Sequence, residues 1–159
     1  MADDRIVMDA GSLILLAKIN ALEILPALSF RYIVPPNVIQ ELTAGLAFGY
    51  TPVHAPWLEV CELREPLSTY IRSTLDEGEA AAIQLAKEQG IRFVCLDDRR
   101  GRRMAKALGL EVVGLLGLLI RAKRQGTITT VREYTDKLLA EGARYSPELL
   151  QTVLANVGE

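Results

Sequence analysis

The sequence of 159 residues predicts an α/β protein in which helices cover both faces of a mostly parallel sheet. Short apolar runs such as Arg31 to Val34 and Phe93 to Leu96 have the length and side chains of buried strands. Helical segments separate these runs, as they do in βαβ units. Glycines at 90, 109 and 126 follow three of the helical segments and indicate where those helices end.

The first half of the chain is expected to hold three strands and three helices. Pro35 and Pro36 end the second strand, and Pro36 suits the first turn of a helix. Residues 45–56 are rich in glycine, proline and aromatic side chains and predict a loop. The expected elements, in order, are strand 5–8, helix 12–21, a short helix near 21–28, strand 31–34, a helix from 36 past 42, and strand 57–63. In this last strand the apolar Leu58, Val60 and Leu63 alternate with Glu59 and Glu62, which indicates one apolar and one wet face.

The second half continues the same alternation and then becomes helical. Asp76 precedes a clear helix, and Ser146 followed by Pro147 is typical of a helix start. We expect a single domain over 1–159, with 130–159 forming a C-terminal helical extension. The expected elements are helix 77–89, strand 93–96, helix 99–108, strand 111–113, helix 114–125, helix 131–141 and a last helix from 146.

Charge and composition exclude several classes of protein. The net charge of −2 does not point to nucleic acid, so any such role must depend on local basic clusters. Cys61 and Cys95 lack CxxC spacing and are expected to be buried thiols. The acidic N-terminus does not resemble a signal peptide, and the longest uncharged apolar stretch, 112–120, is too short to span a bilayer. We therefore expect a cytoplasmic protein with no membrane segment.

Several carboxylates stand where they could converge. Asp9 follows the first strand, and Asp97 and Asp98 follow the strand at 93–96. In a parallel sheet these positions lie at the edge where ligands bind. Glu41 lies on the helix after Pro36, and Glu79 lies in the first turn of the helix that begins at 77.

Each of these acids also has an ordinary structural interpretation. Asp9 and the Asp97/Asp98 pair can cap the helices that follow them, and Glu79 can complete a capping box with Asp76. Glu41 can be a solvated surface residue. If they converge, two carboxylates about 5 Å apart repel by roughly 3 kcal/mol at an effective dielectric near 20. Shared protons, arginines or a divalent cation would have to offset this repulsion, and an all-oxygen site suits Mg²⁺ or Mn²⁺.

Four segments of the chain together resemble the PIN domain, the fold of VapC-type toxins in bacterial and archaeal toxin–antitoxin pairs. The continuation at 109–117 resembles a prokaryotic PIN-like subfamily of largely unassigned role, and the resemblance covers about residues 5 to 125. The four segments are Val7 to Ile14, Val34 to Leu42, Asp76 to Ile83 and Leu96 to Arg103.

The resemblance implies a three-layer α/β/α sandwich with four to five strands, the first and fourth adjacent. It implies that Asp9, Glu41, Glu79 and either Asp97 or Asp98 are catalytic. It further implies that Mg²⁺ or Mn²⁺ bound by Asp9, Glu79, Asp97 and Asp98 supports endonucleolytic cleavage of RNA, often in a homodimer with a cognate antitoxin.

One position departs from the family pattern. Gly11 stands where the family usually has Ser, Thr or Asn, and Ser12 is the candidate to replace that contact. Activity therefore depends on whether Ser12 can do so.

A basic segment directly follows the acidic pair. We expect Arg99, Arg102 and Arg103, with the Ser12 hydroxyl, to hold phosphates of the substrate. The alternative is that these arginines pair with nearby acids or form a solvated face.

The leading prediction is a divalent-metal-dependent endoribonuclease that is the toxin of a toxin–antitoxin-like pair. A catalytically degenerate PIN-like module that acts as a protein-interaction scaffold is the main alternative. A phosphatase of the haloacid-dehalogenase type would need a second Asp at position 11, where this chain has glycine. A receiver domain would usually have a lysine after the strand at 111–113, and none is present.

Overall fold

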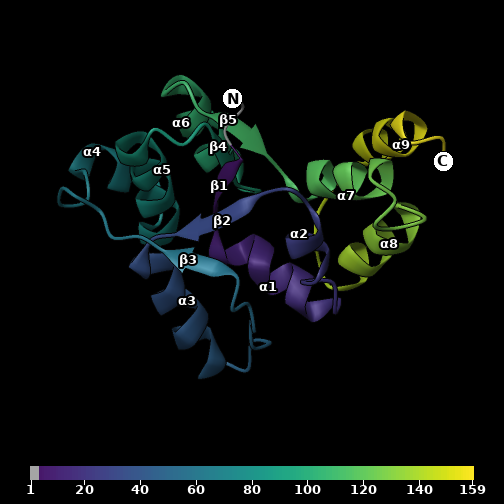
Figure 1. Cartoon of the computed structure of the whole chain (residues 1–159), viewed down its shortest axis with the longest axis horizontal. Coiled ribbons are helices and arrows are strands. Elements are labelled where there is room, and N and C mark those ends of the chain that lie inside the picture. Colours follow the sequence, from purple (N-terminus) through teal and green to yellow (C-terminus); the bar gives the residue numbers. More distant parts are fainter. Residues whose placement is uncertain (1–3) are drawn as a thin grey trace.

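The structure, a computed structural model, describes residues 4–159 and is built around a parallel sheet (Figure 1). The sheet order is β3-β2-β1-β4-β5, and each neighbouring pair is parallel. The first and fourth strands are therefore adjacent, as predicted. The strands are β1 (Arg5–Met8), β2 (Arg31–Val34), β3 (Leu58–Val60), β4 (Phe93–Cys95) and β5 (Glu111–Val113).

Helices cover both faces of this sheet, which confirms the three-layer α/β/α prediction. Successive residues of β1 point to opposite faces, so that Ile6 and Met8 belong to one apolar core and Val7 to the other. The first core includes residues of α1 (Ala10–Lys18), α2 (Ile24–Ala27), α3 (Pro36–Leu46), α7 (Leu115–Arg124), α8 (Arg132–Ala140) and α9 (Pro147–Asn156). The second includes residues of α4 (Thr69–Arg72), α5 (Glu77–Gln89) and α6 (Arg99–Ala107).

The connectivity places the acidic residues at one point of the sheet. The chain runs outward from β1 through β2 to β3, and then crosses to β4 on the other side of β1. Met8 and Cys95 are paired at the ends of β1 and β4. Asp9 and Asp97 therefore follow two adjacent strands at their carboxyl ends, at the switch point where α/β sheets bind ligands.

Several boundaries differ from those expected. α1 begins at Ala10 rather than Ser12 because Asp9 caps it. The expected strand 57–63 is shorter, and the prediction of an apolar face for Val60 is wrong, since its side chain is 56% exposed on this edge strand. α3 continues to Leu46, into the expected loop, and α4 was not expected.

Two bulk expectations are also addressed by the structure. Between residues 4 and 159, no helix is long and apolar enough to cross a membrane. Both cysteines are free thiols, but only Cys95 is buried, and Cys61 is partly exposed.

Candidate active site

Asp9 is a buried carboxylate at the N-terminus of α1. Its Oδ1 accepts a hydrogen bond from the Ser12 backbone N–H at 3.1 Å, and the residue is only 7% exposed. Burial raises the pKa of Asp9 to about 7, the Ser12 hydrogen bonds oppose this rise, and the nearby Asp97 carboxylate adds to it. Asp9 thus carries a charge that the protein solvates poorly.

Ser12 lies behind Asp9 and is completely buried. Its hydroxyl accepts a hydrogen bond from Cys95 Sγ at 3.5 Å, and its side chain hydrogen-bonds with Asp9 and lowers the pKa of that carboxyl. The three side chains form a connected chain that fixes Asp9. Ser12 faces Asp9 rather than open solvent, so a direct contact with substrate phosphate would require movement.

The two adjacent aspartates after β4 have different surroundings. Asp97 is partly buried, and its Oδ1 accepts from the Leu115 backbone N–H at 3.4 Å, while its Oδ2 is buried and has no hydrogen-bond partner among residues 4–159. Burial raises the pKa of Asp97, whereas the Leu115 N–H and the Arg102 guanidinium lower it. Asp98 is exposed and caps α6, since its Oδ2 accepts from the Gly101 N–H at 3.1 Å.

Several of the predicted acids act electrostatically on Glu79. Its side chain is partly buried in the first turn of α5. The pKa of Glu79 is raised to about 8, chiefly by desolvation and then by the carboxylates of Asp76, Asp98, Asp9 and Glu41. Four separate segments of the chain therefore bring negative charge to the same region.

Gly101, in the first turn of α6, lies close to both Glu79 and Asp98. A Cβ added to Gly101 would stand 3.7 Å from Glu79 Oε2, which is an ordinary van der Waals distance, and the N–H of the same glycine donates to Asp98. The start of α6 therefore brings Asp98 near Glu79, in agreement with the effect of the Asp98 charge on the pKa of Glu79.

Glu41 reaches the region from α3. A Cβ at Gly78 would stand only 1.7 Å from Glu41 Oε1, so the Glu41 carboxylate occupies the space that any other residue at position 78 would need. Desolvation and the Asp76 carboxylate raise the pKa of Glu41, and the Gly78 N–H opposes this rise. Gly78 therefore has a role in the site, and sequence reasoning did not identify it.

The structure thus places Asp9, Glu41 and Asp98 within electrostatic range of Glu79, and Asp97 within electrostatic range of Asp9. Within residues 4–159, no three His, Cys, Asp or Glu side chains are close enough together to hold one metal ion. The donors nevertheless suit a hard cation, because all are carboxylate oxygens and Asp97 Oδ2 is buried without a partner. A divalent cation would draw in carboxylates that otherwise repel one another.

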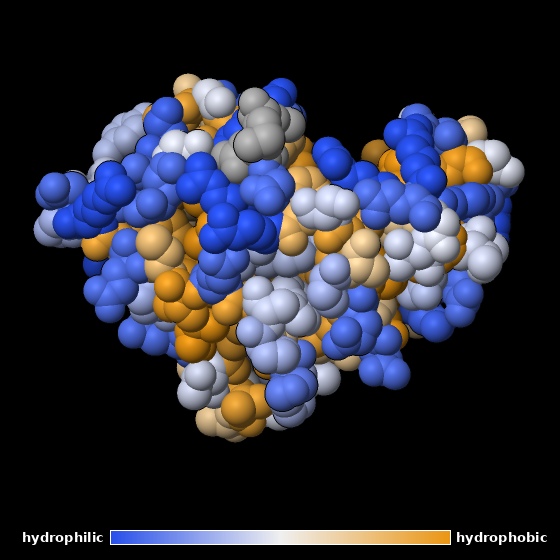
Figure 2. Space-filling model, viewed as in Figure 1, coloured by the Kyte–Doolittle hydropathy of each residue, from blue (hydrophilic) through white to orange (hydrophobic). Residues whose placement is uncertain are grey.

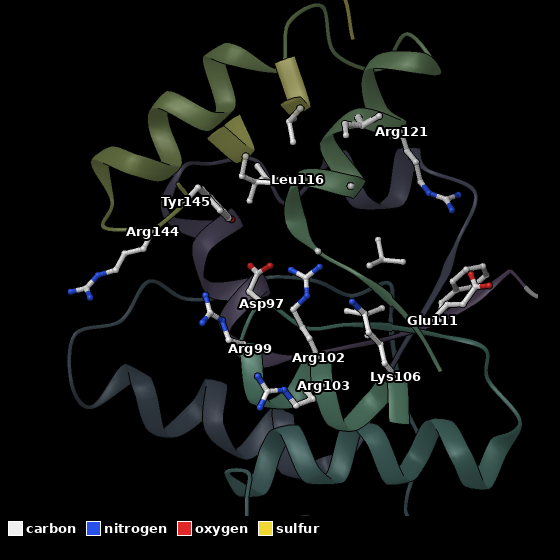
Figure 3. Close-up of a pocket in the computed structure, with 18 residues that line it drawn as sticks. Asp97, Arg99, Arg102, Arg103, Lys106, Glu111, Leu116, Arg121, Arg144 and Tyr145 are labelled. Atoms are coloured by element: carbon white, nitrogen blue, oxygen red, sulfur yellow. The ribbon is translucent and has the colours of Figure 1, made fainter. Parts of the chain in front are cut away.

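A basic cavity of about 880 Å³ adjoins Asp97 (Figure 3). Arg99, Arg102, Arg103 and Lys106 enter it from α6, whereas Arg121 comes from α7. The connection between α8 and α9 closes it with Arg144 and Tyr145, which sequence reasoning did not connect with the site. The remaining lining residues are Phe93, Glu111, Val112, Val113, Gly114, Leu116, Gly117, Ile120, Leu149 and Val153.

The family is decided by comparison with known proteins. Residues 5–159 match a family model, DUF3368, described as a PIN domain. The chain belongs to the PIN-domain family. A search of curated proteins gave no match. PIN domains are generally nucleases, so the family points to a nucleic acid substrate.

The match also extends the resemblance along the chain. The PIN-domain match reaches residue 159 and so includes α8 and α9, whereas the sequence segments that resemble the family end near residue 125. The residues that line the basic cavity from α7 and from the α8–α9 connection therefore lie within the matched region.

Proposed function

We propose that this PIN domain is a divalent-metal-dependent endoribonuclease and the toxin component of a toxin–antitoxin-like pair in the cytoplasm. The observation that supports this proposal most is the set of carboxylates around Glu79, which comes from four segments of the chain and, after burial, raises the pKa of that side chain. A fold alone does not require such an arrangement, because mutual repulsion of these charges costs stability. A bound cation would explain why the chain retains it.

Asp9, Glu79 and Asp97 are the residues that would hold Mg²⁺ or Mn²⁺, with Asp98 at the side of Glu79. Asp97 is preferred to Asp98 as a ligand because its Oδ2 is buried without a partner, whereas Asp98 already caps α6. Such an ion, when bound, lowers the pKa of water and stabilises the oxygens of a phosphodiester displacement.

The other residues would position the substrate and the ligands. Ser12 and Cys95 hold Asp9 from behind, which is how Ser12 compensates for Gly11. Glu41 completes the catalytic set at the N-terminus of α5, where the Gly78 N–H stabilises its charge. Arg99, Arg102 and Arg103 bind the phosphates next to the scissile bond.

Metal-dependent melting and RNA cleavage test this proposal together. Mn²⁺ should raise the melting temperature of the wild-type chain and support cleavage of RNA. Both effects should disappear in Asp9→Asn and in Asp97→Asn, while Asp136→Asn on the exposed side of α8 should retain both. Cleavage that survives either site substitution would contradict the assignment.

The alternative function is a scaffold that binds a partner protein without catalysis. Gly11 in place of the usual polar residue is the observation that favours it. A scaffold should show no Mn²⁺-dependent shift and no cleavage, but should still bind a partner such as an antitoxin. A homodimer is compatible with either function and can be measured by sedimentation.

A further inference from the structure

The basic cavity beside Asp97 suggests how substrate is bound, if the proposed nuclease function is correct. We infer that this cavity binds the sugar–phosphate backbone of single-stranded RNA next to the acidic site. We infer further that the α8–α9 connection forms its far wall through Arg144 and Tyr145. Residues 130–159, which the sequence predicts to be a helical extension, would then be part of substrate binding.

Positive charge is concentrated in this cavity although the whole chain has a net charge of −2. Six cationic and two acidic side chains line it. Glu111 pairs with Arg92, which lies outside the lining. Across the part of the chain that the structure describes, no cation of the cavity takes part in an ion pair within 4.0 Å. Their charges are therefore not neutralised by a carboxylate in direct contact, and an anionic ligand would meet a positive lining.

Two walls of the cavity are held in place by packing. The Arg121 guanidinium lies 4.9 Å from the Phe30 ring centre and 5.9 Å from the Phe93 ring centre, which restricts its orientation. Tyr145 is partly buried against the apolar core and its hydroxyl points toward Asp97 (Figure 3). Burial and then the Asp97 charge raise the pKa of Tyr145, which agrees with this placement. The far wall thus reaches the acidic site directly.

The size and composition of the cavity favour a single strand. About 880 Å³ lies within the range of pockets that enclose small ligands, and a duplex is too wide to enter it. The outline of the molecule is notched above α7, between the sheet and α9, so the hollow opens to solvent (Figure 2). Five of the six cations are arginine, which pairs with phosphate through two hydrogen bonds. A strand lying along these arginines would bring its next phosphate to Asp97.

Binding in EDTA separates this inference from catalysis. The full chain is titrated into a labelled twelve-nucleotide oligouridylate, and anisotropy is followed at several salt concentrations. Arg144→Ala and Arg103→Ala should each weaken binding and reduce the slope of log K against log salt by about 0.7, the value for one lost contact to a single strand. Tyr145→Leu should weaken binding about fivefold or more at every salt concentration. Arg100→Ala is the matched control, because Arg100 lies on the same helix and outside the cavity.

The binding results test RNA binding by the cavity separately from RNA cleavage. Wild-type affinity in both Arg103→Ala and Arg144→Ala would overturn the inference even if the protein cleaves RNA. Equal affinity for a duplex of the same length would overturn the single-strand assignment. Oligoglutamate that displaces the RNA at equal charge concentration would assign the cavity to an acidic protein instead. Cavity-dependent RNA binding in a chain that does not cleave RNA would support the inference and refute the nuclease proposal.

Discussion

Replacing Asp9 with asparagine should make the folded protein more stable, and by much more at pH 8 than at pH 5. The pKa of Asp9 is raised from 3.8 to about 7 in the folded protein. Between these two values the folded state binds more protons than the unfolded state, so the stability of the wild type falls as pH rises. Below 3.8 both states are protonated, and above 7 both are ionised, so the dependence is confined to this window.

The size of the effect follows from the pKa shift. One pKa unit corresponds to about 1.4 kcal/mol, so a rise from 3.8 to about 7 removes about 4 kcal/mol of stability by pH 8. Asp9 is 7% exposed, so solvent screens little of this cost. The hydrogen bonds from Ser12 to the charged carboxylate already lower this pKa, so their loss is included in the shift, and asparagine keeps an acceptor for the Ser12 N–H. The net gain of Asp9→Asn at pH 8 is then about 4 kcal/mol.

Urea unfolding in EDTA at pH 5, 6, 7 and 8 measures this gain. The wild-type curve should fall with pH relative to that of Asp9→Asn, and Asp136→Asn should follow the wild type, since its side chain is exposed on α8. Adding Mn²⁺ at pH 8 should restore the wild type and leave Asp9→Asn unchanged. Parallel curves of unfolding free energy against pH for wild type and Asp9→Asn would refute this prediction, because they would show that the pKa of Asp9 is not raised in the folded protein.

Three further substitutions test other parts of the site and the C-terminal contact. Gly78→Ala should displace Glu41, whose Oε1 would stand 1.7 Å from the new Cβ, and so abolish RNA cleavage, whereas Gly101→Ala, with no contact shorter than 3.6 Å, should retain it. Ser12→Ala should lower the free energy of unfolding by about 1–3 kcal/mol in urea titrations, because buried Asp9 loses a hydrogen bond. Glu159→Gln should lower the melting temperature at pH 7 but not at pH 2. The pKa of Glu159 is lowered to about 2 by hydrogen bonds from Lys123 and two backbone N–H groups, so its contribution is present above pH 4.5 and is lost as pH falls toward 2.

The three central strands of the sheet could be predicted from the sequence because they are short, mostly buried apolar runs. β1, β2 and β4 are bounded by an acid or a proline and separated by helices, so local pattern alone locates them. β3 lies at the edge of the sheet beside β2. The alternation of apolar and polar residues predicted an apolar face for Val60, but at this edge Val60 is exposed. α4 has a single turn, too short for a periodic pattern to appear.

In the candidate site, too, some residues can be predicted from the local sequence, whereas others reach the site only through the fold. Asp9 and the Asp97/Asp98 pair were found because a carboxylate after a buried strand is visible in the sequence. The need for glycine at 78 arises from a glutamate on another helix, and no pattern around position 78 contains that information. Tyr145 is harder still, because the fold alone brings the α8–α9 connection to Asp97. For a site assembled from many segments, the sequence therefore indicates candidate ligands, but it does not indicate the residues that make room for them or that line the adjacent cavity.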